Sequence, residues 1–204
     1  MYVENKLSYS NSKSLFVLFS SLSLIWVIPT EISAQEDFET YSNEKYGFSI
    51  TYPSEWSKTE ESSYESGSSP SPNLSDLDPR PVWRANFIED LDDEFNNYFM
   101  VVVLEPTPTM MEDFNFESYT EDALDGFKFL DFYTIVDSNS TSLGGNHEGY
   151  AIRLVNTDDG DVSSLLWTIY NNRIYRLVYD SDQDEYERLL PIFTRMIESF
   201  RLDP

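Results

Sequence analysis

"EKYGFSITYPSEW", residues 44–56, is the stretch that decides what kind of fold this chain can form. Within it, Phe48, Ile50 and Tyr52 alternate with two hydroxyl residues, which is the spacing of a strand with one apolar face. Pro53 ends the strand because it has no amide proton to donate to a neighbour, and a tryptophan follows three residues later, where it can fold back over the strand end. Aromatic residues at this spacing indicate packing rather than a sugar-binding platform. We therefore interpret the stretch as part of the core.

The residues before this strand have the features of an export signal. Lys6 and Lys13 give a mildly basic start, residues 15–28 form a mostly apolar run, and Ala34 is the small residue that signal peptidases favour at the cleavage site. The run is shorter than the about 20 residues that a membrane-spanning helix needs. The sequence therefore predicts that residues 1–34 are a signal peptide, with an uncleaved N-terminal anchor as the alternative. A lipid-modified cysteine is excluded because the chain has no cysteine.

The rest of the chain, residues 35–204, has the length of one domain. A chain of this size buries roughly 70% of its unfolded surface, so it can be stable without disulfides. It has none, despite the predicted export. Its aromatic content, 16% of the whole sequence, is typical of a folded protein rather than a disordered one.

The net charge of −24 limits the classes of partner. The predicted leader carries two basic and two acidic residues, so the whole excess of negative charge falls on residues 35–204. Such a field repels the phosphates of nucleic acids and anionic lipid headgroups. It favours solubility and attraction to a basic partner, and we expect no binding to nucleic acid.

Apolar periodicity along the chain predicts an α+β fold with an antiparallel sheet. A polar lead-in is expected at residues 35–43, and a Ser-, Pro- and acid-rich insertion, expected to be an exposed loop, at about residues 57–81. The hairpin turn "TDDGD" and the pair Asn171-Asn172 are expected between strands. Beyond the opening strand, the predicted strands are residues 82–89, 96–106, 132–137, 149–156, 162–170 and 173–180, and the predicted amphipathic helices are 116–130 and 186–200, the latter kinked or restarted at Pro191.

Three stretches carry a resemblance to a known family: "YSNEKYGFSITYPSEW" (residues 41–56), "SLGGNHEGYAIRL" (142–154) and "LPIFTRMIESF" (190–200). In this order they resemble the PsbP-like family, extracytoplasmic domains similar to the extrinsic PsbP subunit of photosystem II. The resemblance implies an α/β/α sandwich with a central antiparallel sheet and a C-terminal amphipathic helix. It implies a fold more than a role, since relatives include photosynthetic subunits, bacterial lipoproteins and secreted proteins.

Residues able to do chemistry are few. His147 is the only histidine and lies in the turn "GGNHEG", where we interpret it as a turn residue. Asp180, Asp182 and Asp184 alternate like the start of a calcium loop, but Glu185 replaces the glycine that position six of such a loop requires. We therefore interpret these carboxylates as the cap of the following helix and as complements to its dipole, with calcium binding as the alternative. No cofactor is predicted.

Two sequons, at Asn73 and Asn139, are candidate N-glycosylation sites, and both are expected to lie in exposed loops. We expect a secreted or membrane-surface accessory domain without catalytic activity, located outside the cell or on the outer face of the cytoplasmic membrane. Its expected partner is an extracytoplasmic membrane protein complex or a basic protein, and no membrane span is expected after signal cleavage. The alternative is an extracytoplasmic enzyme or calcium-binding module that uses surface carboxylates.

Overall fold

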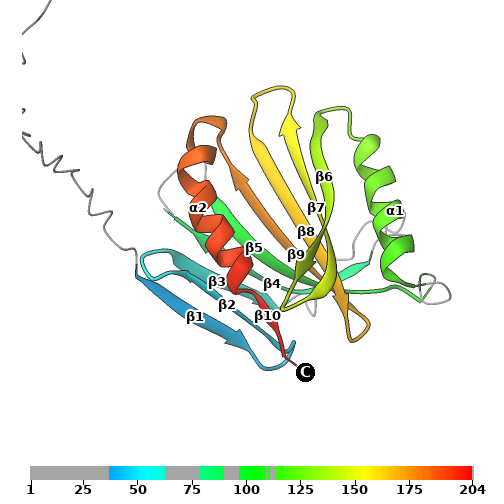
Figure 1. Ribbon diagram of the computed structural model, residues 1–204, viewed down its shortest axis with the longest axis horizontal. Coiled ribbons are helices and arrows are strands. Elements are labelled where there is room, and N and C mark those ends of the chain that lie inside the picture. Colours follow the sequence, from blue (N-terminus) through cyan, green and yellow to red (C-terminus); the bar gives the residue numbers. More distant parts are fainter. Residues whose placement is uncertain (1–36, 63–78, 90–96, 109, 111–113, 204) are drawn as a thin grey trace, which may run out of the picture. The chain divides into compact units, whose positions relative to one another are not determined.

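The structure is a computed structural model that describes residues 37–62, 79–89, 97–108, 110 and 114–203. Its elements form two antiparallel sheets and two helices, in agreement with the predicted α+β class (Figure 1). The elements in chain order are β1 (Phe38–Asn43), β2 (Phe48–Pro53), β3 (Ser57–Ser62), β4 (Arg80–Ile88), β5 (Tyr98–Glu105), α1 (Phe116–Lys128), β6 (Tyr133–Leu143), β7 (His147–Asn156), β8 (Val162–Tyr170), β9 (Arg173–Ser181), α2 (Gln183–Ser199) and β10 (Arg201–Leu202).

The larger sheet contains seven strands in the order β3-β4-β5-β9-β8-β7-β6. All neighbours are antiparallel. The apolar run at residues 98–104 becomes β5, an inner strand buried on both faces, as its sequence predicted. Gly160, with a φ of 88°, and Asn171 and Asn172, with φ values of 49° and 58°, form the two predicted turns. The two asparagines have the positive φ values that a two-residue hairpin turn requires, whereas Gly160 lies in the longer connection between β7 and β8, residues 157–161.

The opening stretch forms β2, the central strand of a small sheet with the order β1-β2-β10. Phe48 and Ile50 have no exposed surface, and Trp56 is buried with its ring 5.9 Å from that of Phe193. The interpretation of this stretch as core is therefore correct. The polar lead-in, by contrast, is wrong over most of its length, because Phe38 and Tyr41 pack against the same core and hold β1 beside β2.

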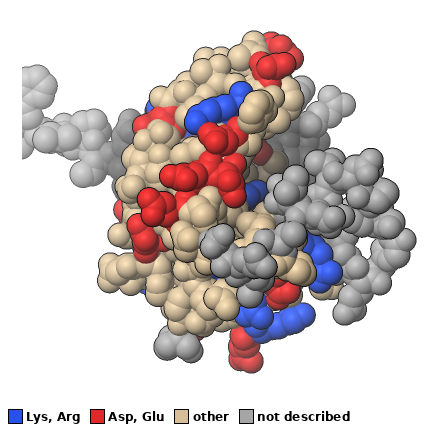
Figure 2. Space-filling model, turned by 90° about the vertical axis from the view of Figure 1, so that its right-hand side faces the viewer, with Lys and Arg blue, Asp and Glu red and all other residues tan. Residues whose placement is uncertain are grey.

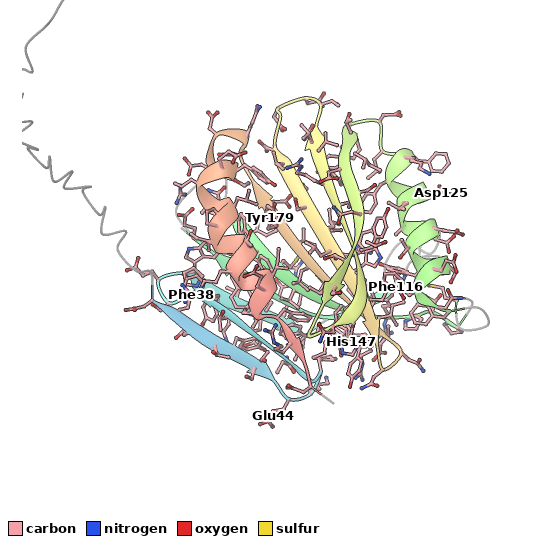
Figure 3. All side chains as sticks on the ribbon, viewed as in Figure 1. Phe38, Glu44, Phe116, Asp125, His147 and Tyr179 are labelled. Atoms are coloured by element: carbon pink, nitrogen blue, oxygen red, sulfur yellow. The ribbon has the colours of Figure 1, made fainter. Side chains whose placement is uncertain are left out.

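Two apolar clusters lie on opposite faces of the larger sheet, because side chains alternate between faces along a strand. Val101 and Val103 of β5 belong to one cluster, and Val102 and Leu104 to the other. The first cluster is covered by α2 and the small sheet, and the second by α1 (Figure 1). Figure 3 shows the position labelled Tyr179 between α2 and the large sheet.

The predicted loop at residues 57–81 is wrong at both ends. Ser57–Ser62 forms the edge strand β3, paired with β4, and Arg80 already belongs to β4. The composition was misleading because β3 is an edge strand exposed on both faces and so can be polar, and charged side chains protect such an edge from pairing with other chains. Residues 63–78 of the predicted loop, and residues 1–34 of the predicted leader, lie outside the described residues.

The C-terminal helix α2 begins at Gln183, earlier than its apolar pattern predicted. It does not restart at Pro191 but continues through this residue as one helix. Tyr186, Leu189, Phe193 and Met196 form its buried face, as expected from their spacing. In the part of the chain that the structure describes, no helix is long and apolar enough to cross a membrane.

Candidate functional site

A cleft of about 800 Å³ lies between α1 and the large sheet, on the strands β3, β4, β5 and β9. Its volume falls in the range of small-molecule sites, about 300–1,000 Å³. Figure 2 views the side of the domain on which α1 lies, where carboxylates are spread over the surface and basic groups are fewer. The described residues that line the cleft are Glu61, Pro79, Pro81, Trp83, Arg84, Met100, Val102, Leu104, Met110, Tyr119, Asp122, Ala123, Gly126, Phe127, Leu130 and Arg176.

The polar part of the floor is one row of residues that crosses the strands. Glu61 of β3 pairs with Arg84 of β4, which pairs with Val102 of β5, and Val102 pairs with Arg176 of β9. The row continues to Trp167 of β8. Directly opposed residues project from the same face of a sheet. Two arginines from segments 92 residues apart therefore share the face that α1 covers.

One wall of the cleft is α1, and local sequence explains why a helix starts there. The side chain of Asn115 accepts a hydrogen bond from the Ser118 amide at 3.0 Å, and the Ser118 hydroxyl accepts one from the Asn115 amide at 3.3 Å. This reciprocal capping pairs two amide groups that the first turn would otherwise leave unpaired. The residues that line the cleft from α1 and from the turn after it recur at spacings of three and one, so they form a single stripe along the helix. They are Tyr119, Asp122, Ala123, Gly126, Phe127 and Leu130.

A buried contact holds α1 against the sheet beside the cleft. The indole Nε1 of Trp167 donates a hydrogen bond to the hydroxyl of Thr120 at 3.0 Å. The ring of Tyr119 meets the indole edge to face, with centroids 6.2 Å apart and planes at 88°. Trp167 is 1% exposed, so this bond satisfies a donor that has no access to water. The helix that forms the wall is thus fixed in position.

The two arginines of the floor have different partners. Arg84 forms an ion pair of 2.6 Å with Glu61, and both side chains are about half exposed. Arg176 is half-buried, and its Nη2 donates to the phenol oxygen of Tyr119 at 2.5 Å. Its Nε is buried without a partner, and no carboxylate among the described residues forms an ion pair with Arg176. The inner end of the cleft therefore presents a cation whose bonded partner is neutral.

The sequence matches the family model of the PsbP-like protein over residues 29–202. The chain belongs to the PsbP-like family. This confirms the resemblance carried by the three stretches of sequence. A comparison with curated proteins finds no match.

Two solved structures support the PsbP-like fold. The cyanobacterial PsbP (CyanoP) of Synechocystis sp. PCC 6803 is 13% identical, with a TM-score of 0.50, over 82% of this chain and 93% of that one. LpqN of Mycobacterium tuberculosis, described as involved in cell envelope biogenesis, is 13% identical, with a TM-score of 0.53, over 82% of this chain and 91% of that one. At such identities the likeness concerns the fold alone.

The three aspartates predicted at the start of α2 lie on different elements of this PsbP-like domain. Asp180 is in β9 and accepts hydrogen bonds from the hydroxyls of Tyr98 and Ser163. Asp182 occupies the position before the first turn of α2, as expected, although its side chain makes no capping hydrogen bond, and Asp184 lies in that first turn. Among the described residues, no three His, Cys, Asp or Glu side chains are grouped so that they could hold a metal ion.

A smaller cavity of about 250 Å³ borders Asp180 and Asp182 and also includes Asp161. Burial raises the pKa of Asp161, and the neighbouring carboxylates of Asp159, Asp182 and Asp180 raise it further. Burial and the charge of Asp180 likewise raise the pKa of the Tyr98 phenol. Of these carboxylates, Asp180 is stabilised by the hydroxyl donors of Tyr98 and Ser163.

His147 and Asn139 lie away from the cleft. His147 is the first residue of β7 and so borders the turn that precedes this strand; it is half-buried, with its ring centroid 4.6 Å from that of Tyr170 (Figure 3). Asn139 is exposed, but it lies within β6 opposite Ala151, so its expected loop position is wrong. The sequon at Asn73 lies outside the described residues.

The polar residues of the cleft were not predicted from the sequence. Arg84 lies in "VWRANF" and Arg176 in "IYRLVY", each between apolar neighbours of a strand. One signal for a polar site was available in the sequence, namely a charged residue at a position of a predicted strand that points inward. Only the register of three strands, however, brings the two arginines to one face.

Proposed function

We propose that this protein is an exported, non-catalytic PsbP-like accessory domain that works outside the cytoplasm by binding a ligand or partner at the α1 cleft. The observation that carries the proposal is the cleft itself, a hollow of about 800 Å³ lined by apolar side chains together with two arginines and two carboxylates. Sites of this composition bind and orient molecules.

The chemistry of the lining favours binding over catalysis. Its titratable side chains are the carboxyls of Glu61 and Asp122, the phenol of Tyr119 and two guanidinium groups. General acid–base catalysis near neutral pH works best with a group whose pKa is close to the working pH, most often a histidine. The single histidine, His147, lies at the start of β7 instead, with its ring tilted against that of Tyr170 and outside the lining of the cleft.

Two features support a location outside the cytoplasm. The first 34 residues have the pattern of a secretory signal, and LpqN, a structure similar to this domain, is described as involved in cell envelope biogenesis. The charge of −24 suits a basic partner protein at the membrane surface and opposes binding to nucleic acid.

Site-specific photocrosslinking in intact cells tests the proposal. Phe129, the C-cap residue of α1, is 83% exposed, so a photoreactive phenylalanine analogue fits there without disturbing the fold. Glu44, exposed in the turn between β1 and β2, serves as the matched control, and Figure 3 labels it far from α1. We expect a product with an envelope protein from position 129 that is absent from position 44. Equal products from both positions, or recovery of the protein in the cytoplasmic fraction, would overturn the proposal.

A further inference from the structure

We propose that the α1 cleft binds a single-chain anionic amphiphile, with its acidic headgroup at Arg176 and its apolar chain between α1 and the sheet. The inference rests on the proposed binding role of the cleft and adds the chemical class of the ligand. Its chemistry is that of a long-chain carboxylate or an alkyl phosphate.

Arg176 is the reason for an anionic headgroup. A half-buried guanidinium is usually paired with a carboxylate, because removing a charge from water is costly unless a counter-charge replaces the hydration. Here its bonded partner is the neutral phenol of Tyr119, and its Nε has no acceptor. A carboxylate or phosphate oxygen could supply the missing negative charge, and a planar guanidinium suits both groups.

The remaining lining explains why the ligand needs a chain. Met100, Val102 and Leu104 form the floor, and Phe127 and Leu130 form part of the α1 wall. A small hydrated anion leaves these side chains facing water, whereas a chain removes their apolar surface from it. Each buried methylene raises affinity roughly fourfold, from about 0.8 kcal/mol per group.

Gly126 contributes to the opening of the cleft. A Cβ built at this position has no heavy atom within 4 Å, although glycine in a helix interior costs about 1 kcal/mol relative to alanine. The position therefore gives a way to fill the cleft without disturbing the core. A leucine in place of Gly126 extends into space that the ligand would occupy.

The electrostatics of the whole domain make the proposal specific. The domain is strongly acidic, and Glu61 and Asp122 also line the cleft, so the average field repels an anion. Glu61 is held by Arg84 at 2.6 Å, and Asp122 is exposed on α1. If an anionic amphiphile nevertheless binds better than a cationic one of equal length, the local guanidinium determines the preference rather than the net charge.

Titration calorimetry on the purified domain, below micelle-forming concentrations, provides the test. The probes are dodecanoate, dodecyl phosphate, dodecyltrimethylammonium and acetate. We expect both dodecyl anions to bind with one-to-one stoichiometry and at least tenfold more tightly than the cation, and acetate to show no binding. Octanoate and decanoate give the chain-length dependence, which should approach fourfold per methylene.

Four variants locate the site. Gly126→Leu should abolish dodecanoate binding, whereas Gly126→Ala should retain it. Arg176→Gln should weaken it about 10- to 100-fold, the range for a hydrogen bond to a charged group. Lys128→Gln removes the same charge from an exposed position of α1 outside the lining and should have little effect.

Preferential binding of the cation, binding of acetate as strong as that of dodecanoate, or unchanged binding by Gly126→Leu would each overturn the proposal. If Arg176→Gln does not fold, Gly126→Leu still decides the outcome. If no amphiphile binds, the proposed accessory role is still tested separately by the crosslinking experiment, because a protein partner at the cleft would give crosslinks without amphiphile binding.

Discussion

The two faces of the large sheet are built for different purposes. On the α2 face, large aromatic side chains fill the space between the sheet, the helix and the small sheet, and Phe48, Phe99, Phe193 and Phe200 have no exposed surface. On the α1 face, the helix is fixed at Trp167, while beside it the strands β3, β4, β5 and β9 line an open cleft. The α2 face supplies stability, and the α1 face leaves room for a ligand.

The closely packed face should tolerate truncation least. Phe193 of α2 is fully buried, and its ring centroid lies 4.2 Å from that of Tyr179 and 5.9 Å from that of Trp56. Phe193→Ala should lower the free energy of unfolding by about 3–5 kcal/mol, because a buried phenylalanine leaves a cavity. Phe127→Ala, in the cleft wall, should cost clearly less because its ring already borders open space. Urea unfolding of both variants measures the difference.

Equal losses in these two variants would contradict the comparison, because they would mean that the cleft wall is packed as tightly as the core. Phe129→Ala is a control for the loss of an aromatic ring from an exposed site. Because 83% of the Phe129 side chain is exposed, the free energy of unfolding of Phe129→Ala should stay within about 0.5 kcal/mol of the wild-type value.

The second prediction concerns the contact that fixes α1. Thr120→Val keeps the shape of the side chain and removes the hydroxyl that accepts from Trp167, which leaves a buried indole N–H unpaired. Such a loss costs about 1–3 kcal/mol. Unfolding in urea should show this decrease, and hydrogen exchange should show faster opening of α1 than of α2.

Thr134→Val is the matched control, because Thr134 is exposed in β6 and the change should be nearly neutral there. If Thr120→Val and Thr134→Val have the same stability, the hydrogen bond does not hold the helix in place.

The same difference between faces explains what the sequence could reveal. The core on the α2 face was predictable, because packing leaves a periodic signal in the local sequence. This signal is the alternation of large apolar residues at positions 48–52 and the spacing of three and four residues along α2. The small sheet was partly missed, since β10 has two residues and β1 is mostly polar, and both are held in place by pairing with β2.

The cleft was not predictable from local pattern. Its floor depends on long-range register, in which Arg84 and Arg176 are brought to either side of Val102. The local sequence indicates which side chains of a strand point toward the core. It does not indicate which strands pair with each other, because that depends on the tertiary fold. For this reason, the sequence indicated the carboxylates at the start of α2, which are close together along the chain, and not the arginines of the cleft.

Alkaline pH should destabilise the domain through two tyrosines of the small sheet. Burial, together with hydrogen bonds to carboxylates, raises the pKa of Tyr41 and of Tyr52 to about 12, from an unfolded value of about 10. The folded state holds these two phenol protons more tightly than the unfolded state does. The contribution of the two tyrosines to the free energy of unfolding is therefore complete below about pH 10 and is lost as the pH rises towards 12. Melting temperatures measured from pH 8 to pH 12 should therefore fall above about pH 10.

The variant Tyr41→Phe/Tyr52→Phe, which cannot ionise at these positions, should show a shallower fall over the same range. Its stability at pH 8 provides the baseline for the lost hydrogen bonds to Glu60 and Glu39. An identical pH dependence in variant and wild type would show that other groups control alkaline unfolding.

The smallest expected effect is a gain in stability at the cleft. Gly126 lies inside α1, and a Cβ there meets no heavy atom within 4 Å, so Gly126→Ala removes the entropic cost of glycine without a clash. The free energy of unfolding should rise by about 0.5–1 kcal/mol, which raises the melting temperature by roughly 1–4 °C in a domain of this size. Gly47→Ala is the opposite control, because Gly47 has a φ of 62°, where an alanine is strained. A loss of stability in Gly126→Ala would show that a side chain at this position has no room, and would remove one of the observations that make the α1 face a binding surface.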